Sequence, residues 1–110
     1  MSLIADERGC AERLAKFFPA LPAIRVMVRV QSLRPGREKL KESTVLEFGS
    51  GQIAIFMTTL PLEFDECLEL VRSSKERTQK ATVIALQYHE GLKAVAVRFT
   101  DGTCDWMTQP

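Results

Sequence analysis

Apolar residues recur at helical spacing in the first part of the chain, over about Leu3 to Phe18. Lys16 lies near the end of this segment, where a cation suits the helix dipole. Pro19 and Pro22 follow and end any helix. The pattern predicts an N-terminal helix with a linker over residues 1–22, and the apolar face of that helix must pack against another part of the protein.

From Ile24 onward the spacing changes to two, because apolar and polar side chains alternate through IRVMVRV. This alternation is typical of a strand that buries one face. Later strand-like segments are separated by turn residues; they cover residues 39–48, 52–58, 67–72, 81–88 and 92–99. The pattern predicts an all-β fold in which residues 23–110 form a small six-stranded antiparallel β-barrel, since closure leaves no strand edge exposed.

Length and charge limit the classes of protein that the chain can represent. Its 110 residues suit one domain, and a hydrophobic content of 45% is typical of a globular protein. A formal net charge of +1 gives no global field toward nucleic acid or an acidic membrane. No apolar run approaches the roughly 18 residues of a membrane-spanning helix. We expect a cytoplasmic protein without nucleic-acid or membrane partners, and we expect the alternating charges of residues 34–42 to be solvated.

The three cysteines, Cys10, Cys67 and Cys104, are far apart and have no histidine at metal-ligand spacing. We expect reduced thiols that behave as small buried hydrophobic residues, and no metal site. His89 lies where the chain is expected to turn, and the sequence identifies no nucleophile or carboxylate as its partner. No catalytic set of residues is recognisable, so the sequence predicts a non-enzymatic protein without a cofactor.

The segment VLEFGSGQIAIF, residues 45–56, allows two interpretations. In the structural one, Gly49 and Gly51 provide the positive φ angles of a tight hairpin between two strands. In the functional one, Glu47 and the backbone of the Gly-Ser-Gly bend form a corner that binds a nucleotide. Glu47 could bond a guanine edge, but its charge would repel a phosphate, so the structural interpretation is favoured.

Four short sequence motifs occur in or next to the predicted strands. They are VRV at residues 28–30, VLEFGSGQIAIF around the bend, Pro61-Leu62 before the fourth strand, and the pair ATV and AVRF in the last two strands. Trp106 follows shortly after the final strand. In this order the motifs resemble those of the PilZ domain family, bacterial modules that commonly bind cyclic di-GMP. The resemblance implies a regulatory domain built on a barrel of the split type.

The resemblance also implies a ligand site with two signatures, and this chain departs from both. An Arg-x-x-x-Arg signature should precede the first strand and clamp phosphates and guanine edges. Arg25 and Arg29 have this spacing but lie inside the strand, where residues four apart share a face and are expected to point outward. At the bend, Glu47 can replace the family's acid, but Gly49 occupies the serine position and Ser50 comes one position later. These departures indicate a degenerate cyclic di-GMP site.

A module without these signatures is expected to act by binding another protein. The candidate interaction residues are aromatic: Phe17, Phe18, Phe64 and Trp106. Two alternatives remain open. One is a cyclic di-GMP receptor with a non-standard site, which would comprise Arg25, Arg29, Glu47, Gly49 and Ser50. The other is a structural module that pairs with a second copy of itself as a homodimer.

Overall fold

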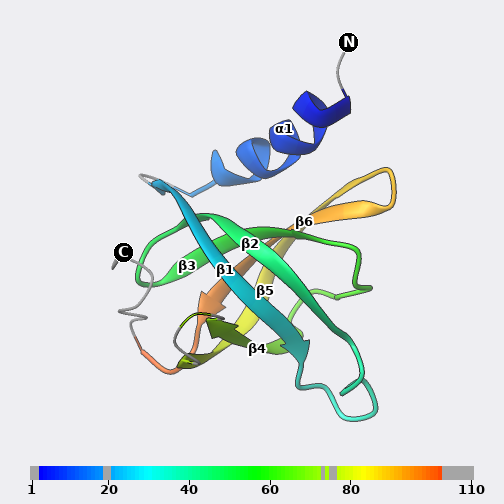
Figure 1. The fold of residues 1–110 in the computed structure, drawn as a ribbon, viewed down its shortest axis with the longest axis vertical. Coiled ribbons are helices and arrows are strands. Elements are labelled where there is room, and N and C mark those ends of the chain that lie inside the picture. The colour runs from blue at the N-terminus through cyan, green and yellow to red at the C-terminus, as the bar shows by residue number, and fades with distance from the viewer. Residues whose placement is uncertain (1–2, 19–20, 73, 75–76, 103–110) are drawn as a thin grey trace.

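The computed structural model describes residues 3–18, 21–72, 74 and 77–102, without the side chains of residues 3–8. The elements are α1 (Leu3–Ala15), β1 (Ala23–Ser32), β2 (Lys41–Gly49), β3 (Ile53–Thr58), β4 (Cys67–Arg72), β5 (Arg77–His89) and β6 (Leu92–Phe99). The strands pair antiparallel and close into a barrel in the order β1-β2-β3-β6-β5-β4. The predicted six-stranded barrel with an N-terminal helix is therefore confirmed, and Figure 1 shows α1 lying outside it.

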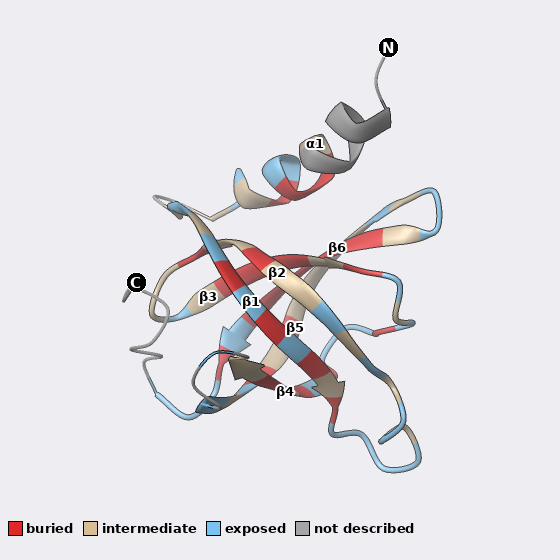
Figure 2. Ribbon diagram, viewed as in Figure 1, coloured by how far each residue is buried: buried red, intermediate tan, exposed pale blue. Residues whose placement is uncertain are grey.

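β1 lies between β2 and β4, and buried and exposed residues alternate along most of it (Figure 2). The valines of β1 point into the barrel and are buried. The residues that alternate with them are exposed: Arg25, Met27 and Arg29. The sequence predicts this arrangement, because neighbouring residues on a strand face opposite ways.

The barrel interior holds the larger of two apolar cores, and every strand contributes to it. Its buried members are Val26, Val28, Val30, Leu46, Ala54, Phe56, Leu62, Leu68, Leu70, Ala81, Val83, Val95, Val97 and Phe99. Leu62 comes from the loop between β3 and β4 rather than from a strand. This loop therefore inserts a side chain into one end of the barrel and closes it.

The second core lies on the outer surface of the barrel, beneath α1. Its buried members are Cys10, Ala11 and Leu14 of the helix, with Ile55, Ala94 and Ala96 of β3 and β6. Because α1 covers their outer face, β3 and β6 are buried on both faces over most of their length. Small alanine side chains let the helix approach the sheet closely.

Two element boundaries differ from the predicted ones by three residues or more. α1 ends at Ala15 instead of near Phe18, because the N–H groups of Phe17 and Phe18 bond the carbonyls of Leu14 and Ala15 in tighter turns. β5 begins at Arg77 instead of Ala81, because its first residues pair with β4. Among the described residues, no helix is long and apolar enough to cross a membrane.

The two hairpin bends are stabilised differently, one by residues with positive φ and the other by hydrogen bonds to a serine side chain. Between β5 and β6, Glu90 and Gly91 both have positive φ, at 44° and 87°, as a two-residue hairpin loop requires. At the bend between β2 and β3, neither glycine is among the described residues with positive φ, so that part of the structural interpretation was wrong. Ser50 closes this bend instead, since its hydroxyl accepts bonds from the N–H groups of Gln52 and Ile53 at 3.2 and 3.3 Å.

β5 is longer than its neighbour β4, and the hairpin that it forms with β6 extends past the rest of the barrel (Figure 1). On one side β5 pairs with β6 from Ala81 to His89. On the other side it pairs with β4 only as far as Thr82. The barrel is closed, yet the last part of β5 leaves one edge without a partner strand among the described residues.

Candidate functional site

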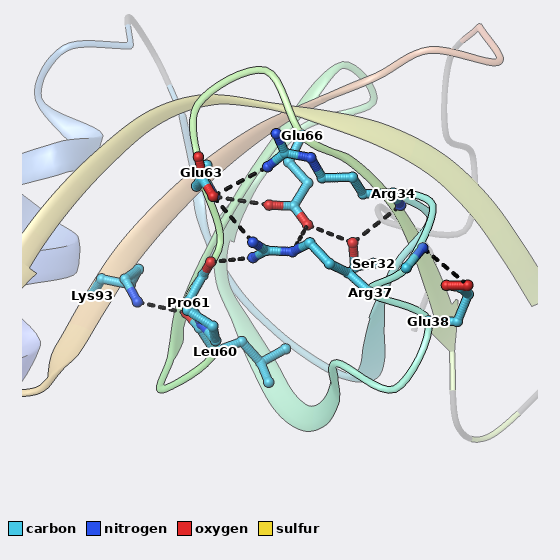
Figure 3. A network of polar contacts seen from close by, with 10 residues as sticks. Ser32, Arg34, Arg37, Glu38, Leu60, Pro61, Glu63, Glu66 and Lys93 are labelled. Atoms are coloured by element: carbon cyan, nitrogen blue, oxygen red, sulfur yellow. Dashed lines mark hydrogen bonds and ion pairs between the residues drawn. The ribbon is translucent and has the colours of Figure 1, made fainter.

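A network of charged and polar groups joins two loops at the end of the barrel where β1 and β3 end (Figure 3). At its centre is the carboxylate of Glu66, which is fully buried. Glu66 Oε2 accepts a hydrogen bond from the hydroxyl of Ser32, and Oε1 accepts one from the N–H of Glu63 at 2.9 Å. A buried carboxylate requires partners of this kind, because leaving it unpaired is costly.

Arg37 connects the loop after β1 to the loop after β3. Its Nη1 donates to Glu63 Oε2 at 3.1 Å, and its Nη2 donates to the carbonyl of Pro61. Its Nε lies 3.2 Å from Glu66 Oε2 as an ion pair, without the geometry of a hydrogen bond. Arg34 Nη1 lies 3.1 Å from the same oxygen of Glu63. The guanidinium of Arg37 thus holds the loop that carries Leu62 in the barrel mouth.

Glu42 anchors a second polar contact between the start of β2 and the end of β3. Its carboxylate accepts hydrogen bonds from the Thr58 hydroxyl at 2.6 Å and from the N–H and hydroxyl of Thr59 at 3.1 and 2.5 Å. Burial by itself raises the pKa of Glu42, but these hydrogen bonds and the nearby Lys93 ammonium outweigh it, so its pKa lies below the ordinary value. Lys93 also donates to the carbonyl of Leu60 at 2.5 Å.

These polar groups bind one another and the backbone of the two loops, which is a structural role. The sequence did not predict it, since the segment of alternating charges that contains Arg37 and Glu42 was expected to be solvated. The partners of Arg37 lie 24 to 29 positions away along the chain. No local pattern encodes a contact over that separation.

Of the residues proposed to bind a ligand, Arg25 and Glu47 line one pocket of about 500 Å³. Its other lining residues are Glu12, Ala23, Ile24, Val45 and Phe48, so it lies where α1 passes the start of β1 and the end of β2. Arg29 points outward as predicted but does not line this pocket.

The remaining two proposed ligand residues have structural partners at the bend. The N–H of Gly49 donates to the carbonyl of Pro22 at 3.0 Å, and the N–H of Ser50 donates to the carbonyl of Ile53 at 2.8 Å. Because the Ser50 hydroxyl also accepts two backbone bonds, this bend is organised by its own contacts. The structure therefore brings together two of the five proposed ligand residues.

The proposed interaction residues have different surroundings. Phe17 is 77% exposed, whereas Phe18 is partly buried against the core beneath α1. Phe64 is 69% exposed beside a hollow of about 300 Å³ that Cys67 also lines. Trp106 lies outside the described residues.

An apolar groove of about 730 Å³ runs between the C-terminal part of α1 and β5. The helix side of its lining comprises Arg13, Leu14, Lys16 and Phe17, and the strand side comprises Ala85, Leu86 and Gln87. The sequence predicted the helix and this strand but not their juxtaposition. Of the residues that line the groove, Phe17 is the one that the sequence predicted to bind a partner.

The cysteines are not alike in burial. Cys10 is buried on the face of α1 that packs against the barrel, and its thiol donates a weak bond to the carbonyl of Gln87. Cys67 is exposed, which corrects the expectation that all three are buried: it is on the outward face of β4, opposite the inward Leu68. Cys104 lies outside the described residues. Within the part of the chain that the structure describes, no group of three or more potential metal ligands occurs.

A comparison of the chain with known protein families finds no match, and a comparison with curated proteins finds none either. Functional proposals therefore depend on the geometry of the groove and the pocket.

Proposed function

We propose that this chain is a PilZ-like regulatory module of the cytoplasm, which acts by binding another protein and has no catalytic activity. The observation that carries the proposal is the exposure of the Phe17 ring beside a groove whose walls include Leu14, Ala85 and Leu86. A large apolar side chain at a concave apolar surface is typical of protein-binding sites, where aromatic residues supply much of the affinity.

The surroundings of the charged residues support a binding role. Glu42, Glu66 and Arg37 have close partners, and those partners lie at the end of β3 or in the loop that follows it and closes the barrel. Groups used in this way stabilise a scaffold and are not available to bind a substrate. The barrel then serves as a rigid support for the groove beside α1.

Site-specific photocrosslinking in the source cells tests the proposal. A photoreactive phenylalanine analogue at Phe17 is expected to give one discrete adduct with a second protein. The matched control carries the analogue at Lys39, which is exposed in the loop after β1. Absence of an adduct from position 17, or equal adducts from both positions, would contradict the proposed surface.

The pocket that contains Arg25 and Glu47 favours a second candidate function, a cyclic di-GMP receptor with a non-standard site. A guanidinium can bind a phosphate or the acceptor edge of guanine, and a carboxylate can accept from the donor edge. Both groups line one cavity of about 500 Å³. Against this candidate, Glu12 and Glu47 place two carboxylates in the same cavity, and they would repel phosphate groups.

Calorimetric titration separates the two candidates. We expect no heat when cyclic di-GMP is added to the purified chain at moderate salt, with cyclic di-AMP as the control nucleotide. A dissociation constant of about 10 micromolar, roughly 6.8 kcal/mol, would favour the receptor instead. Arg25→Ala should then abolish binding, while Arg29→Ala should weaken it less because Arg29 does not line the pocket.

A further inference from the structure

The unpaired edge of β5 begins just after Val83. The N–H of Val83 donates to the carbonyl of Glu66, and the carbonyl of Val83 accepts from the N–H of Asp65, both at 2.9 Å. Beyond this contact, residues 85–89 pair with β6 on one side and have no strand partner on the other among the described residues.

The pairing with β6 determines which backbone groups point to the free edge. His89 and Leu92 close the two-residue loop, and such a closing pair exchanges backbone hydrogen bonds. In an antiparallel ladder every second pair does so, which assigns the same role to Gln87 with Ala94. The N–H and carbonyl groups of Leu86 and Tyr88 are therefore directed away from β6, to the open side.

The apolar groove runs along this same edge. Ala85, Leu86 and Gln87 all line it, although consecutive residues of a strand point to opposite faces. Ala85 packs against the core beneath α1 and Leu86 against the core inside the barrel, so the groove touches residues of both faces and follows the edge of the strand. Its opposite wall is α1, through Leu14 and Phe17. A strand edge and a helix thus border a channel of about 730 Å³.

The edge lacks the residues that usually prevent strand addition. Proteins protect open edges with charged side chains, especially lysine, and with proline. Residues 85–89 are Ala-Leu-Gln-Tyr-His, with none of these, and Tyr88 is 70% exposed. An extended chain could pair with this edge and cover the apolar floor at the same time, which is how several peptide-binding domains work.

Charge selects the occupant of the groove. Among the described residues that line it, the charged ones are the cations Arg13 and Lys16, and none is acidic. Arg13 Nε donates to the carbonyl of Gly9 at 3.2 Å, which orients the guanidinium along the helix. Two copies of this chain paired through their β5 edges would bring both pairs of cations together, so a second copy is a poor occupant.

We infer that the edge of β5 at Leu86 and Tyr88, together with α1, binds an extended acidic segment of a partner protein as an added strand. This inference rests on the proposed function, because it names the kind of segment that the Phe17 surface receives. Backbone pairing supplies affinity, the apolar floor accepts alternate side chains of the segment, and Arg13 and Lys16 select for acidic residues.

Selection of a displayed library of random peptides on the intact chain provides the probe. The enriched peptides should be acidic and alternate apolar with polar residues. One enriched peptide is then synthesised in two N-methylated forms, with methyl groups on one set of alternate amides or on the other set. We expect one form to bind about tenfold more weakly and the other to bind normally, because only one edge of the peptide faces β5. No enrichment, or equal affinity for both forms, would overturn the inference.

Variants of the protein test the same contact from the other side. Tyr88→Pro removes an N–H that is directed to the free edge, so it should weaken peptide binding about tenfold, whereas Tyr88→Ala keeps that N–H and should bind within about twofold of the parent. Arg13→Glu with Lys16→Glu should weaken binding at low salt. Lys39→Glu with Lys41→Glu should not, because these residues lie in the loop after β1 and at the start of β2 and do not line the groove. Equal binding by the two Tyr88 variants would contradict strand addition.

Two further outcomes separate this inference from the proposed function. If the Phe17 adduct forms equally well in the Tyr88→Pro background, the interaction function stands and the strand-addition inference fails. If the chain is a dimer in light scattering and Tyr88→Pro makes it monomeric, the edge binds a second copy, and the acidic partner is excluded.

Discussion

The hydroxyl of Thr58 donates a 2.6 Å hydrogen bond to Glu42, which joins the end of β3 to the start of β2. Thr59 adds two further bonds to the same carboxylate. The contact lies beside the loop that carries Leu62 into the barrel, so the ionised form of Glu42 helps to hold the barrel mouth closed.

The first prediction concerns pH. The pKa of Glu42 is lower in the folded protein than its reference value of 4.5, so ionised Glu42 stabilises the fold above that pH. This stabilisation is lost as the pH falls through the lowered folded pKa. Glu42→Gln should therefore reduce the free energy of unfolding by about 1 kcal/mol at pH 7, and the difference should shrink toward pH 3.

Urea denaturation at several pH values measures this effect. The matched control is Asp101→Asn, an exposed acid after β6, which should change stability little at any pH. A Glu42→Gln deficit that persists unchanged at low pH would show that the lost charge is not its cause.

The second prediction concerns the buried carboxylate of Glu66. Glu66→Ala removes the acceptor for Ser32 and the ion-pair partner of Arg37, so it should lower the free energy of unfolding by about 2 to 3 kcal/mol. Glu63→Gln removes an exposed charge of the same network and should cost less than about 1 kcal/mol. Equal losses in urea midpoint for the two variants would contradict the central role of Glu66.

The third prediction uses two glycines whose added methyl groups would both enter open space. Gly91 has a φ of 87°, so Gly91→Ala should destabilise the protein by about 1 kcal/mol through backbone strain. Gly9 lies inside α1, so Gly9→Ala should stabilise it by up to about 1 kcal/mol. Thermal unfolding should therefore move in opposite directions for the two variants, and a shared direction would disprove the argument.

The fourth prediction concerns thiol reactivity. Exposed Cys67 should react with a thiol reagent in the native protein, and buried Cys10 should react only after unfolding. Mass spectrometry of the labelled peptides gives the rate at each site, with Cys67→Ser as the control. Labelling of Cys10 at the rate of Cys67 would mean that α1 does not stay packed on the barrel.

Much of the fold can be predicted from sequence because it is local. The period-two pattern of β1 predicts both the strand and the outward direction of Arg25 and Arg29, and the structure has both. The position of the helix also follows from its spacing. The surface of the barrel on which the helix packs cannot be predicted in this way. It contains small residues such as Ala94 and Ala96, which contribute little to a hydrophobic pattern in the sequence.

The candidate sites could be predicted less well. Arg37 and Glu66 are ordinary loop residues in sequence, and their pairing depends on a contact between two loops. A closed barrel is expected to leave no strand edge unpaired. This expectation holds for β4 but fails for β5, because β5 extends seven residues beyond its pairing with β4. That difference in strand length, together with the helix above it, creates the groove.

The alanine layer beneath α1 also controls the geometry of the groove. Ala94 and Ala96 touch the helix from below, and the groove opens between that helix and the edge of β5. A larger side chain at either position would lift α1 and widen the channel without altering a single lining residue. Substitutions at these two positions would therefore change the width of the groove, and with it the size of the segment that fits, without changing the residues that line it. Related chains could differ in binding partner in this way while their grooves keep the same lining residues.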